Sequence, residues 1–194
     1  FMFTNMKELA IPKNVSDIEP GAFFGVFTDK IVVDEENPYY STDEYGVLFN
    51  EDKTTLIAWP ALCSEVNYTV PETVKIINIV AFGYAPRLEA VTLPEGLEEI
   101  GEGVFGISGI KSINIPASVK TIYEDAFVSA FDLEEIIVDE DNTYFSSEDG
   151  VLFNKDKTSL LCYPEGKTDR EYTIPETVTS LYNHFSSALY LRRL

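Results

Sequence analysis

The stretch LEAVTLPEGLEEIGEGVF, residues 88–105, decides the fold, because a second copy of its pattern follows within a few residues. That copy, IKSINIPASVKTIYEDAF, covers residues 110–127. In both, an apolar triad precedes a proline. Further apolar residues stand 3 and 6 positions after the proline, and a phenylalanine stands 11 positions after it. Self-similarity at a fixed period is typical of proteins built from stacked structural units, so the pattern predicts a repeat array.

The same template recurs around Pro12, Pro71 and Pro175, with the phenylalanine 10 positions after the proline in the last copy. The template prolines Pro71, Pro94 and Pro116 are 23 and then 22 residues apart. That spacing lies within the period of about 20–29 residues that makes one coil of a leucine-rich-repeat solenoid. The triad before each proline reads as a short strand with alternate side chains turned inward. Proline has no N–H for the ladder and therefore ends the strand.

Each template closes with a phenylalanine that is expected to fill the core where the coil ends. In three copies the preceding residue is alanine, and we expect the Ala-Phe pair to lie in a turn of helix. Phe82, Phe105 and Phe127 should then be almost fully buried and stacked, coil upon coil.

A longer unit occurs twice, at residues 33–60 and 138–164. Both copies contain Val-Leu-Phe, a polar Asn-x-Asp-Lys turn, and a leucine followed by an aromatic residue and proline. Two apolar runs joined by such a turn are typical of a β-hairpin. Each copy lies within a 59-residue spacing between template prolines, so both occupy equivalent places. We therefore expect residues 1–194 to form one continuous array with no linker and no second domain.

These residues resemble the BspA-like leucine-rich repeats of bacterial surface proteins. Residues 142–164 match the hairpin motif of that family almost letter by letter, and residues 37–60 match it with Tyr45 inserted and Trp59 replacing tyrosine. The resemblance implies a leucine-rich-repeat solenoid with short parallel strands on the concave face, an irregular or short helical convex side, and two hairpin-containing long repeats. It also implies a non-catalytic module for adhesion or protein–protein contact, extracellular or at the cell surface.

The charge of the chain narrows the choice of partner. There are 33 acidic and 14 basic side chains, for a formal net charge of −19. Such a chain repels phosphates, which argues against nucleic acid and anionic membrane surfaces. A hydrophobic content of 45% is enough for a core and excludes a disordered acidic tail. No apolar run approaches the roughly 18 residues of a membrane span. With these classes excluded, the family resemblance implies a host or matrix protein as the partner.

Chemical functions find little support in the sequence. His184 is the single histidine, so a histidine-based metal cluster cannot form and a catalytic triad is not indicated. Cys63 and Cys162 are expected to be free thiols, because two cysteines do not make a disulfide framework. The acidic runs 34–37 and 139–142 could be calcium ligands, but turn-forming Asp and Asn residues explain them equally well. We expect no cofactor, no metal and no enzymatic activity, with an acid/base hydrolase as a remote alternative.

The partner is expected to bind along the concave face, as solenoids characteristically do. Candidate binding residues are those between the inward apolar positions of each strand. They are Glu8, Ala10, Ala90, Thr92, Ser112, Asn114, Glu135, Ile137, Glu171 and Thr173. These outward residues differ between copies while the inward ones stay apolar. That difference favours a binding module over the alternative, a rigid spacer that presents another domain.

Both ends of the chain fall within a repeat. We therefore expect an excised piece of a longer array, whose terminal coils fray or associate end to end because neither end carries a polar cap.

Overall fold

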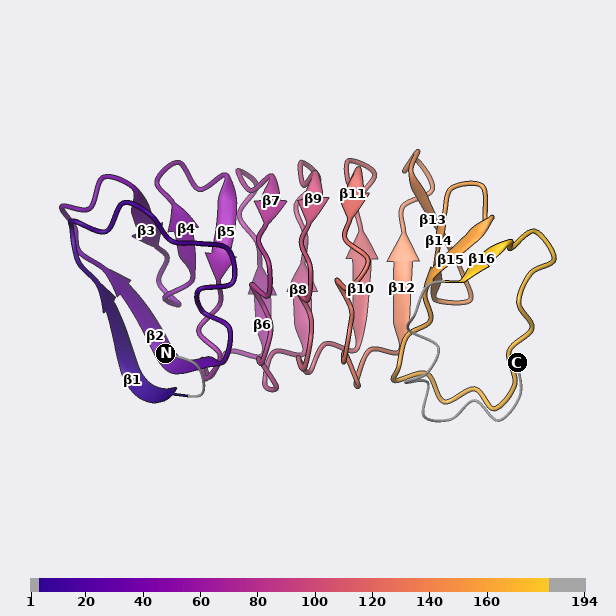
Figure 1. Ribbon diagram of the computed structural model, residues 1–194, viewed down its shortest axis with the longest axis horizontal. Helices are drawn as coiled ribbons and strands as arrows, with labels where there is room; N and C mark the ends of the chain where they lie inside the picture. The colour runs from indigo at the N-terminus through magenta and orange to yellow at the C-terminus, as the bar shows by residue number, and fades with distance from the viewer. Residues whose placement is uncertain (1–3, 182–194) are drawn as a thin grey trace.

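The structure, a computed structural model, describes residues 4–181 and is a solenoid of short strands (Figure 1). The strands that open successive coils stand side by side in the lower row of Figure 1. They are β6 (Asn67–Thr69), β8 (Ala90–Thr92), β10 (Ser112–Ile115) and β12 (Glu135–Val138). β6 pairs with β8, and β10 with β12, both in parallel. This confirms the short parallel strands, and their outer surface is called the strand face below.

The apolar residues after each proline form a second row of strands, which stands above the first in Figure 1. One sheet runs in the order β11-β9-β7-β5-β4-β3. Its coil strands are β7 (Ile76–Ile77), β9 (Glu99–Ile100) and β11 (Thr121–Ile122), which are parallel to one another. Its remaining strands are β3 (Tyr40–Thr42), β4 (Leu48–Asn50) and β5 (Thr55–Ala58). The sheet therefore grows from a hairpin, one coil at a time.

Both predicted hairpins are present. β4 pairs with β5 in antiparallel fashion, and so does β14 (Val151–Asn154) with β15 (Ser159–Cys162). Each hairpin carries a third antiparallel strand that the sequence did not reveal, namely β3 and β13 (Phe145–Glu148). The second hairpin continues into a parallel strand, β16 (Ser180–Leu181).

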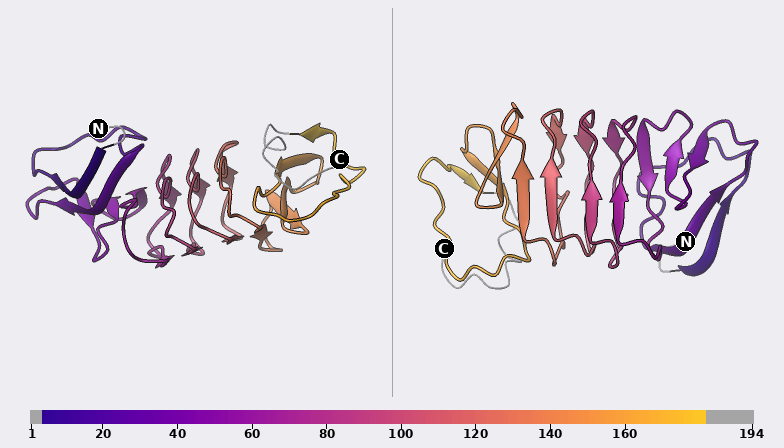
Figure 2. Two further views of the ribbon diagram at one scale, coloured as in Figure 1. Left: turned by 90° about the horizontal axis from the view of Figure 1, so that it is seen from below. Right: turned by 180° about the vertical axis from the view of Figure 1, so that it is seen from behind.

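The first coil is built from two longer strands, β1 (Thr4–Ile11) and β2 (Val26–Val33), which pair in parallel. They form a sheet of their own and are tilted against the row from β6 to β12 (Figures 1 and 2). The first hairpin stands between them and the strand face. The lower row of strands is therefore interrupted at the first hairpin, whereas the upper row continues from that hairpin into the coils.

The coil-closing phenylalanines form the predicted stack. Phe82, Phe105 and Phe127 have 0%, 1% and 5% of their surface exposed. Their ring centroids are 5.9 and 5.5 Å apart, with interplanar angles of 4° and 12°. Repetition of one aromatic at one position per coil thus produces a continuous aromatic column through the central core.

The expected helical turns at these phenylalanines are wrong, because residues 4–181 contain no helix. The coil ends are single turns with i to i+3 hydrogen bonds, such as that from the N–H of Ala126 to the carbonyl of Tyr123 at 3.0 Å. Tyr84 and Ile107 have φ values of 60° and 57°, which a right-handed helix does not allow. Of the two forms expected for the convex side, irregular or short helical, the structure has the irregular one.

Each hairpin is a wall that is apolar on both faces. In the first, Val47 and Phe49 belong to the central core, whereas Leu48 packs with the first coil. In the second, Leu152 belongs to the central core and Phe153 to a cluster on the far side. Successive side chains of a strand point to opposite faces, so the uninterrupted Val-Leu-Phe run supplies both cores at once.

Candidate functional site

The strand face carries six of the ten candidate residues in one array. All six are exposed and come from β8, β10 and β12: Ala90, Thr92, Ser112, Asn114, Glu135 and Ile137. Pairing aligns Ser112 with Glu135 and Asn114 with Ile137. Because the coils are parallel, equivalent residues of successive coils become neighbours across the face.

Strand β6 adds two residues that sequence reasoning missed. Asn67 and Thr69 are exposed and pair with Ala90 and Thr92. The signal was available, since the segment before Pro71 has the alternation of the other copies. A tyrosine at the inward position concealed it, and Tyr68 is indeed buried, with 5% of its surface exposed.

The other four candidates do not join this array. Glu8 and Ala10 are exposed on β1, in the separate sheet that β1 forms with β2. Glu171 and Thr173 are exposed in a segment that follows the second hairpin and belongs to no multi-residue strand. The hairpins separate both pairs from the central strands.

A shallow groove of about 400 Å³ crosses the strand face at the carboxyl ends of its strands. Thr92, Asn114 and Ile137 line it, with Glu95 and Asp139 among the residues at its margin. Ile137 is 45% exposed, which is unusual for isoleucine in a strand. The groove thus combines small polar groups, apolar residues of which Ile137 is the exposed one, and acidic neighbours. Such a set can bind a protein surface.

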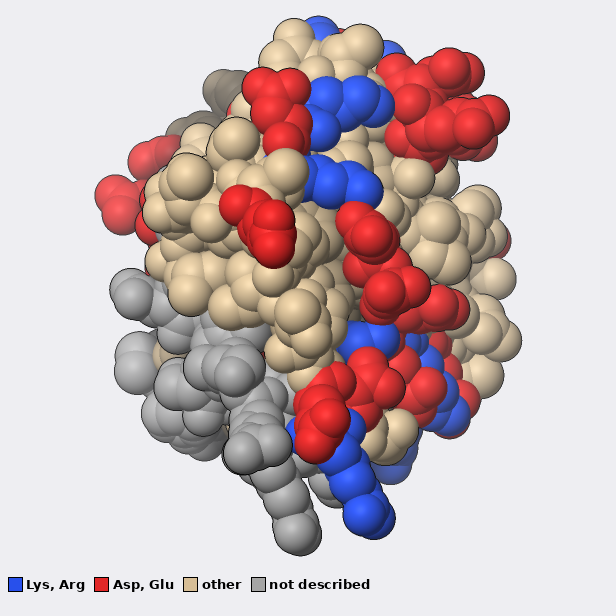
Figure 3. Space-filling view, turned by 90° about the vertical axis from the view of Figure 1, so that its right-hand side faces the viewer, with Lys and Arg blue, Asp and Glu red and all other residues tan. Residues whose placement is uncertain are grey.

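Some charged residues form ion pairs between neighbouring coils. Lys111 contacts Glu89 at 3.1 Å, and Lys120 contacts Glu98 at 2.6 Å. The bond from Lys120 lowers the pKa of the Glu98 carboxyl and raises that of the lysine. These pairs are exposed and contribute little to stability. Figure 3 shows basic side chains interleaved with more numerous acidic ones on the C-terminal side of the molecule.

The acidic runs after β2 and β12 are turns. The N–H groups of Glu36 and Asp141 each bond the carboxylate two residues earlier, at 2.9 Å. The asparagine that ends each run, Asn37 or Asn142, is buried. Within residues 4–181 no three His, Cys, Asp or Glu side chains are grouped so as to hold a metal ion. His184 lies outside the described residues.

The two cysteines are free and buried. Burial raises the pKa of the Cys63 thiol, and it raises that of Cys162 to about 12. A nucleophilic cysteine needs a lowered pKa, so the surroundings of both thiols favour the unreactive, protonated form.

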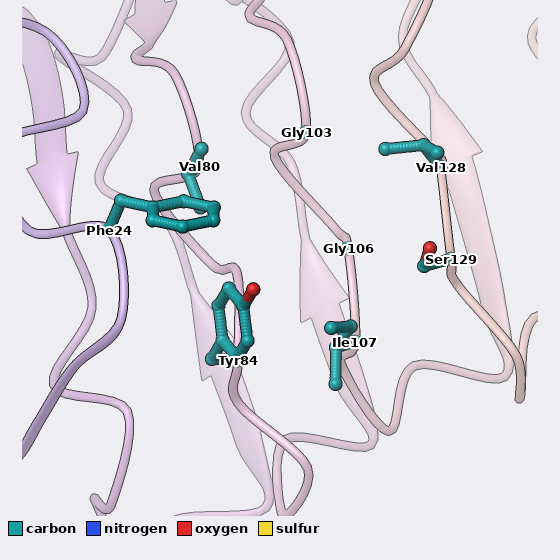
Figure 4. Close-up of a pocket in the computed structure, with 8 residues that line it drawn as sticks. All are labelled: Phe24, Val80, Tyr84, Gly103, Gly106, Ile107, Val128 and Ser129. Atoms are coloured by element: carbon teal, nitrogen blue, oxygen red, sulfur yellow. The ribbon is translucent and has the colours of Figure 1, made fainter. Parts of the chain in front are cut away.

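A second small groove lies on the turn side of the coils, and Figure 4 shows its lining. Phe24 reaches from the first coil to Val80 and Tyr84, and its ring meets that of Tyr84 edge-on with centroids 5.3 Å apart. The groove is about 110 Å³ in volume and mostly apolar. The contact of Phe24 with Tyr84 at this groove helps to join the first coil to the central ones.

The segment between β12 and the last described strand also carries a buried acid. Glu165 is 3% exposed, and its Oε1 accepts the N–H of Ser129 at 3.1 Å. In the regular coils the equivalent N–H groups, those of Tyr84 and Ile107, donate to the next coil's carbonyls at 2.9 Å. Glu165 therefore continues the turn ladder where the hairpin interrupts it.

Comparison with known proteins gives a consistent result. A family model for the BspA type leucine-rich repeat region matches residues 61–157, in six copies. No protein among the curated sequences matches the chain. Residues 4–181 contain no helix of the length and apolarity needed to cross a bilayer.

Several solved structures share the fold. The pneumococcal vaccine antigen PcpA is 26% identical with a TM-score of 0.65, over 95% of this chain and 44% of that one. A leucine-rich-repeat protein from Eubacterium ventriosum is 21% identical, with a TM-score of 0.67 over 90% of this chain and 57% of that one. A leucine-rich cell surface protein from Faecalibacterium prausnitzii is 24% identical, with a TM-score of 0.65 over 96% and 53%.

The chain thus spans about half the length of the solved structures that it matches. Its proline-centred coils, its two hairpin walls and the match over residues 61–157 agree. The chain belongs to the BspA-type leucine-rich-repeat family.

Proposed function

We propose that this chain is a protein-binding module of a cell-surface protein, and that it engages its partner along the strand face. One observation carries the proposal. Outward residues at one register position change from asparagine in β6 to alanine, serine and glutamate, whereas the inward residues stay apolar and buried. Such variation over a constant core gives each coil a different set of side chains to present to a partner.

The relatives and the charge support the same role. The family is typically non-catalytic, and the solved structures include a vaccine antigen and a leucine-rich cell surface protein. A net charge of −19 favours a partner with basic patches over nucleic acid or an anionic membrane. Adhesion to a host or matrix protein is the form of binding that we propose.

The test compares two arginine substitutions by surface plasmon resonance against a panel of purified matrix and host-surface proteins. Ile137→Arg alters the strand face, where this side chain is 45% exposed. Ile107→Arg is the matched control, because Ile107 is 37% exposed on the turn side. A panel protein whose binding falls at least about tenfold with the first variant alone supports the proposal. Equal loss with both variants, or no binding to any panel protein, favours a rigid spacer.

A further inference from the structure

The six-stranded sheet stops at β11, where main-chain acceptors meet no donor within residues 4–181. Each coil strand donates to the coil before it: the N–H of Lys120 bonds the carbonyl of Glu98 at 2.9 Å, and that of Tyr123 bonds Ile100 at 3.0 Å. The carbonyls of Lys120 and Ile122 are the equivalent acceptors of β11. No described residue donates to them. An edge of this kind is a template for one more strand.

A cavity of about 330 Å³ lies beside this edge. Ile122, Tyr123 and Phe127 line it from the coil, and Leu152 and Leu161 are among the residues that line it from the second hairpin. In Figure 1, β13 is the next strand beyond β11 in the upper row, but the two belong to different sheets. The edge of β11 therefore adjoins a space that is walled by apolar side chains.

The equivalent coil residues next to the first hairpin, among them Ile18, Glu19 and Phe23, line a cavity of about 450 Å³, but no residue of the hairpin lines it. There Ile57, which corresponds to Leu161, is 9% exposed and packs in one cluster with Ile18 and Phe23. At the second hairpin Leu161 is only partly buried and lines the cavity. At the second hairpin the slot is therefore lined by the coil and the hairpin together, whereas at the first the cavity is lined by the coil alone.

We propose that β11 and this cavity form a second interaction site, which accepts an extended segment of a partner protein as an added parallel strand. The existing sheet indicates what fits. Its strands β7 and β9 each end in an isoleucine, Ile77 or Ile100, that is fully buried. A partner segment with an apolar residue at that position continues the same hydrogen-bond pattern and fills the cavity.

Charge specifies the residues that flank this apolar position. Glu124 lines the cavity and forms no ion pair among the described residues, whereas the nearby Lys120 is already paired with Glu98. The free charge at the slot is therefore negative. A lysine or arginine beside the apolar residue complements it.

The probe is a fluorescein-labelled peptide, Lys-Thr-Val-Lys-Ile-Ile-Asn-Lys, which copies residues 73–78 between two added lysines. Its binding is followed by fluorescence anisotropy. Ser159→Trp fills the cavity, which Ser159 lines. Thr55→Trp is the matched control, because Thr55 holds the same place in the first hairpin, where its N–H bonds Asn50 as that of Ser159 bonds Asn154.

We expect the peptide to bind the natural chain and Thr55→Trp alike, and to bind Ser159→Trp at least about tenfold more weakly. Absence of binding at about 1 mM peptide, or equal binding by both tryptophan variants, overturns the proposal. If Ser159→Trp unfolds at a lower temperature than the natural chain, a second pair of variants is compared for peptide binding. These are Glu124→Lys and, as its control in the preceding coil, Glu102→Lys. The former should weaken binding at low salt more than the latter, and an equal effect overturns the proposal.

This site is independent of the strand face. Ile137→Arg should leave peptide binding unchanged, so failure of one proposal is distinguishable from failure of the other.

Discussion

The two hairpin units share one framework to within a few tenths of an ångström. In each, a buried asparagine donates from Nδ2 to two carbonyls of the preceding coil and accepts two N–H groups of its own loop. For Asn37 the four distances are 2.8–3.0 Å, and for Asn142 they are 2.8–2.9 Å. Lys53 and Lys157, in the hairpin turns, have φ values of 54° and 52°. The local structure therefore follows from the shared residues alone.

The units differ in what packs behind them. After the first, Tyr68 and Ile77 are 5% and 0% exposed. Their counterparts after the second are Tyr172, which is partly buried, and Leu181, which is 52% exposed. Equivalent residues in equivalent local structure thus bury different areas. The motif sets the conformation, and the next coil supplies the burial that stabilises it.

Removal of the inner phenylalanine should damage both units alike. Phe49 and Phe153 are each 0% exposed, so alanine at either position should lower the free energy of unfolding by about 3–5 kcal/mol. Urea denaturation followed by circular dichroism measures the change. A loss below about 1 kcal/mol at Phe153 alone would mean that the second wall is not packed as the first is.

The next pair of substitutions should change the stability of the two units by different amounts. Ile77→Ala leaves a cavity in a packed core and should cost about 2–4 kcal/mol. Leu181→Ala removes a side chain that is half exposed, and it should cost less than about 1 kcal/mol. Equal losses in the same urea titration would contradict the view that burial, and not the motif, sets the energetic weight of this position.

The buried asparagines should again behave alike. Asn37→Ala or Asn142→Ala leaves two carbonyls and two N–H groups without the amide, and each variant should lose about 1–3 kcal/mol. Thermal unfolding by calorimetry measures the loss. Replacement of the neighbouring exposed residue, Glu36→Ala or Asp141→Ala, serves as control and should change stability by less than about 0.5 kcal/mol.

The smallest effect concerns Cys162, where the first hairpin has Ala58. Burial raises the thiol pKa from 9.0 to about 12. The unfolded chain therefore loses this proton first, so the thiol's contribution to stability is constant below pH 9 and falls above it. At pH 10 the natural chain should lose about 1 kcal/mol relative to Cys162→Ala. Urea titrations at pH 8 and pH 10 measure this difference, and parallel pH profiles would contradict it.

The fold was predictable because its determinants are local and repeated. The proline-centred template gave the strand face, the aromatic stack and the coil period, and the Val-Leu-Phe motif gave the hairpins. The third strands, β3 and β13, were missed because their Tyr-Ser-Thr and Phe-Ser-Ser-Glu sequences lack an alternating apolar pattern. The helical turns were wrong because residues such as Tyr84 adopt a positive φ that their side chains do not signal.

The candidate site was predictable in part. Register across β8, β10 and β12 followed from the repeat, but the loss of Glu8 and Glu171 from the array did not. An inserted hairpin separates strands that the repeat alone places side by side. The slot beside β11 has no sequence signal at all, since Ile57 and Leu161 are both ordinary apolar residues at one motif position. Only the packing around them differs.

The hairpin walls also determine the order in which the molecule should unfold under a stretching force. They divide the apolar residues into a large central cluster and two small ones, with Ile31 among the first coil's residues and Tyr163 among those beyond the second wall. A pull on the two ends should unfold the outer parts first, because their apolar clusters are smaller than the central one. The aromatic column then remains as a folded remnant at higher force. A chain built in this way should lengthen in steps while its central face stays intact.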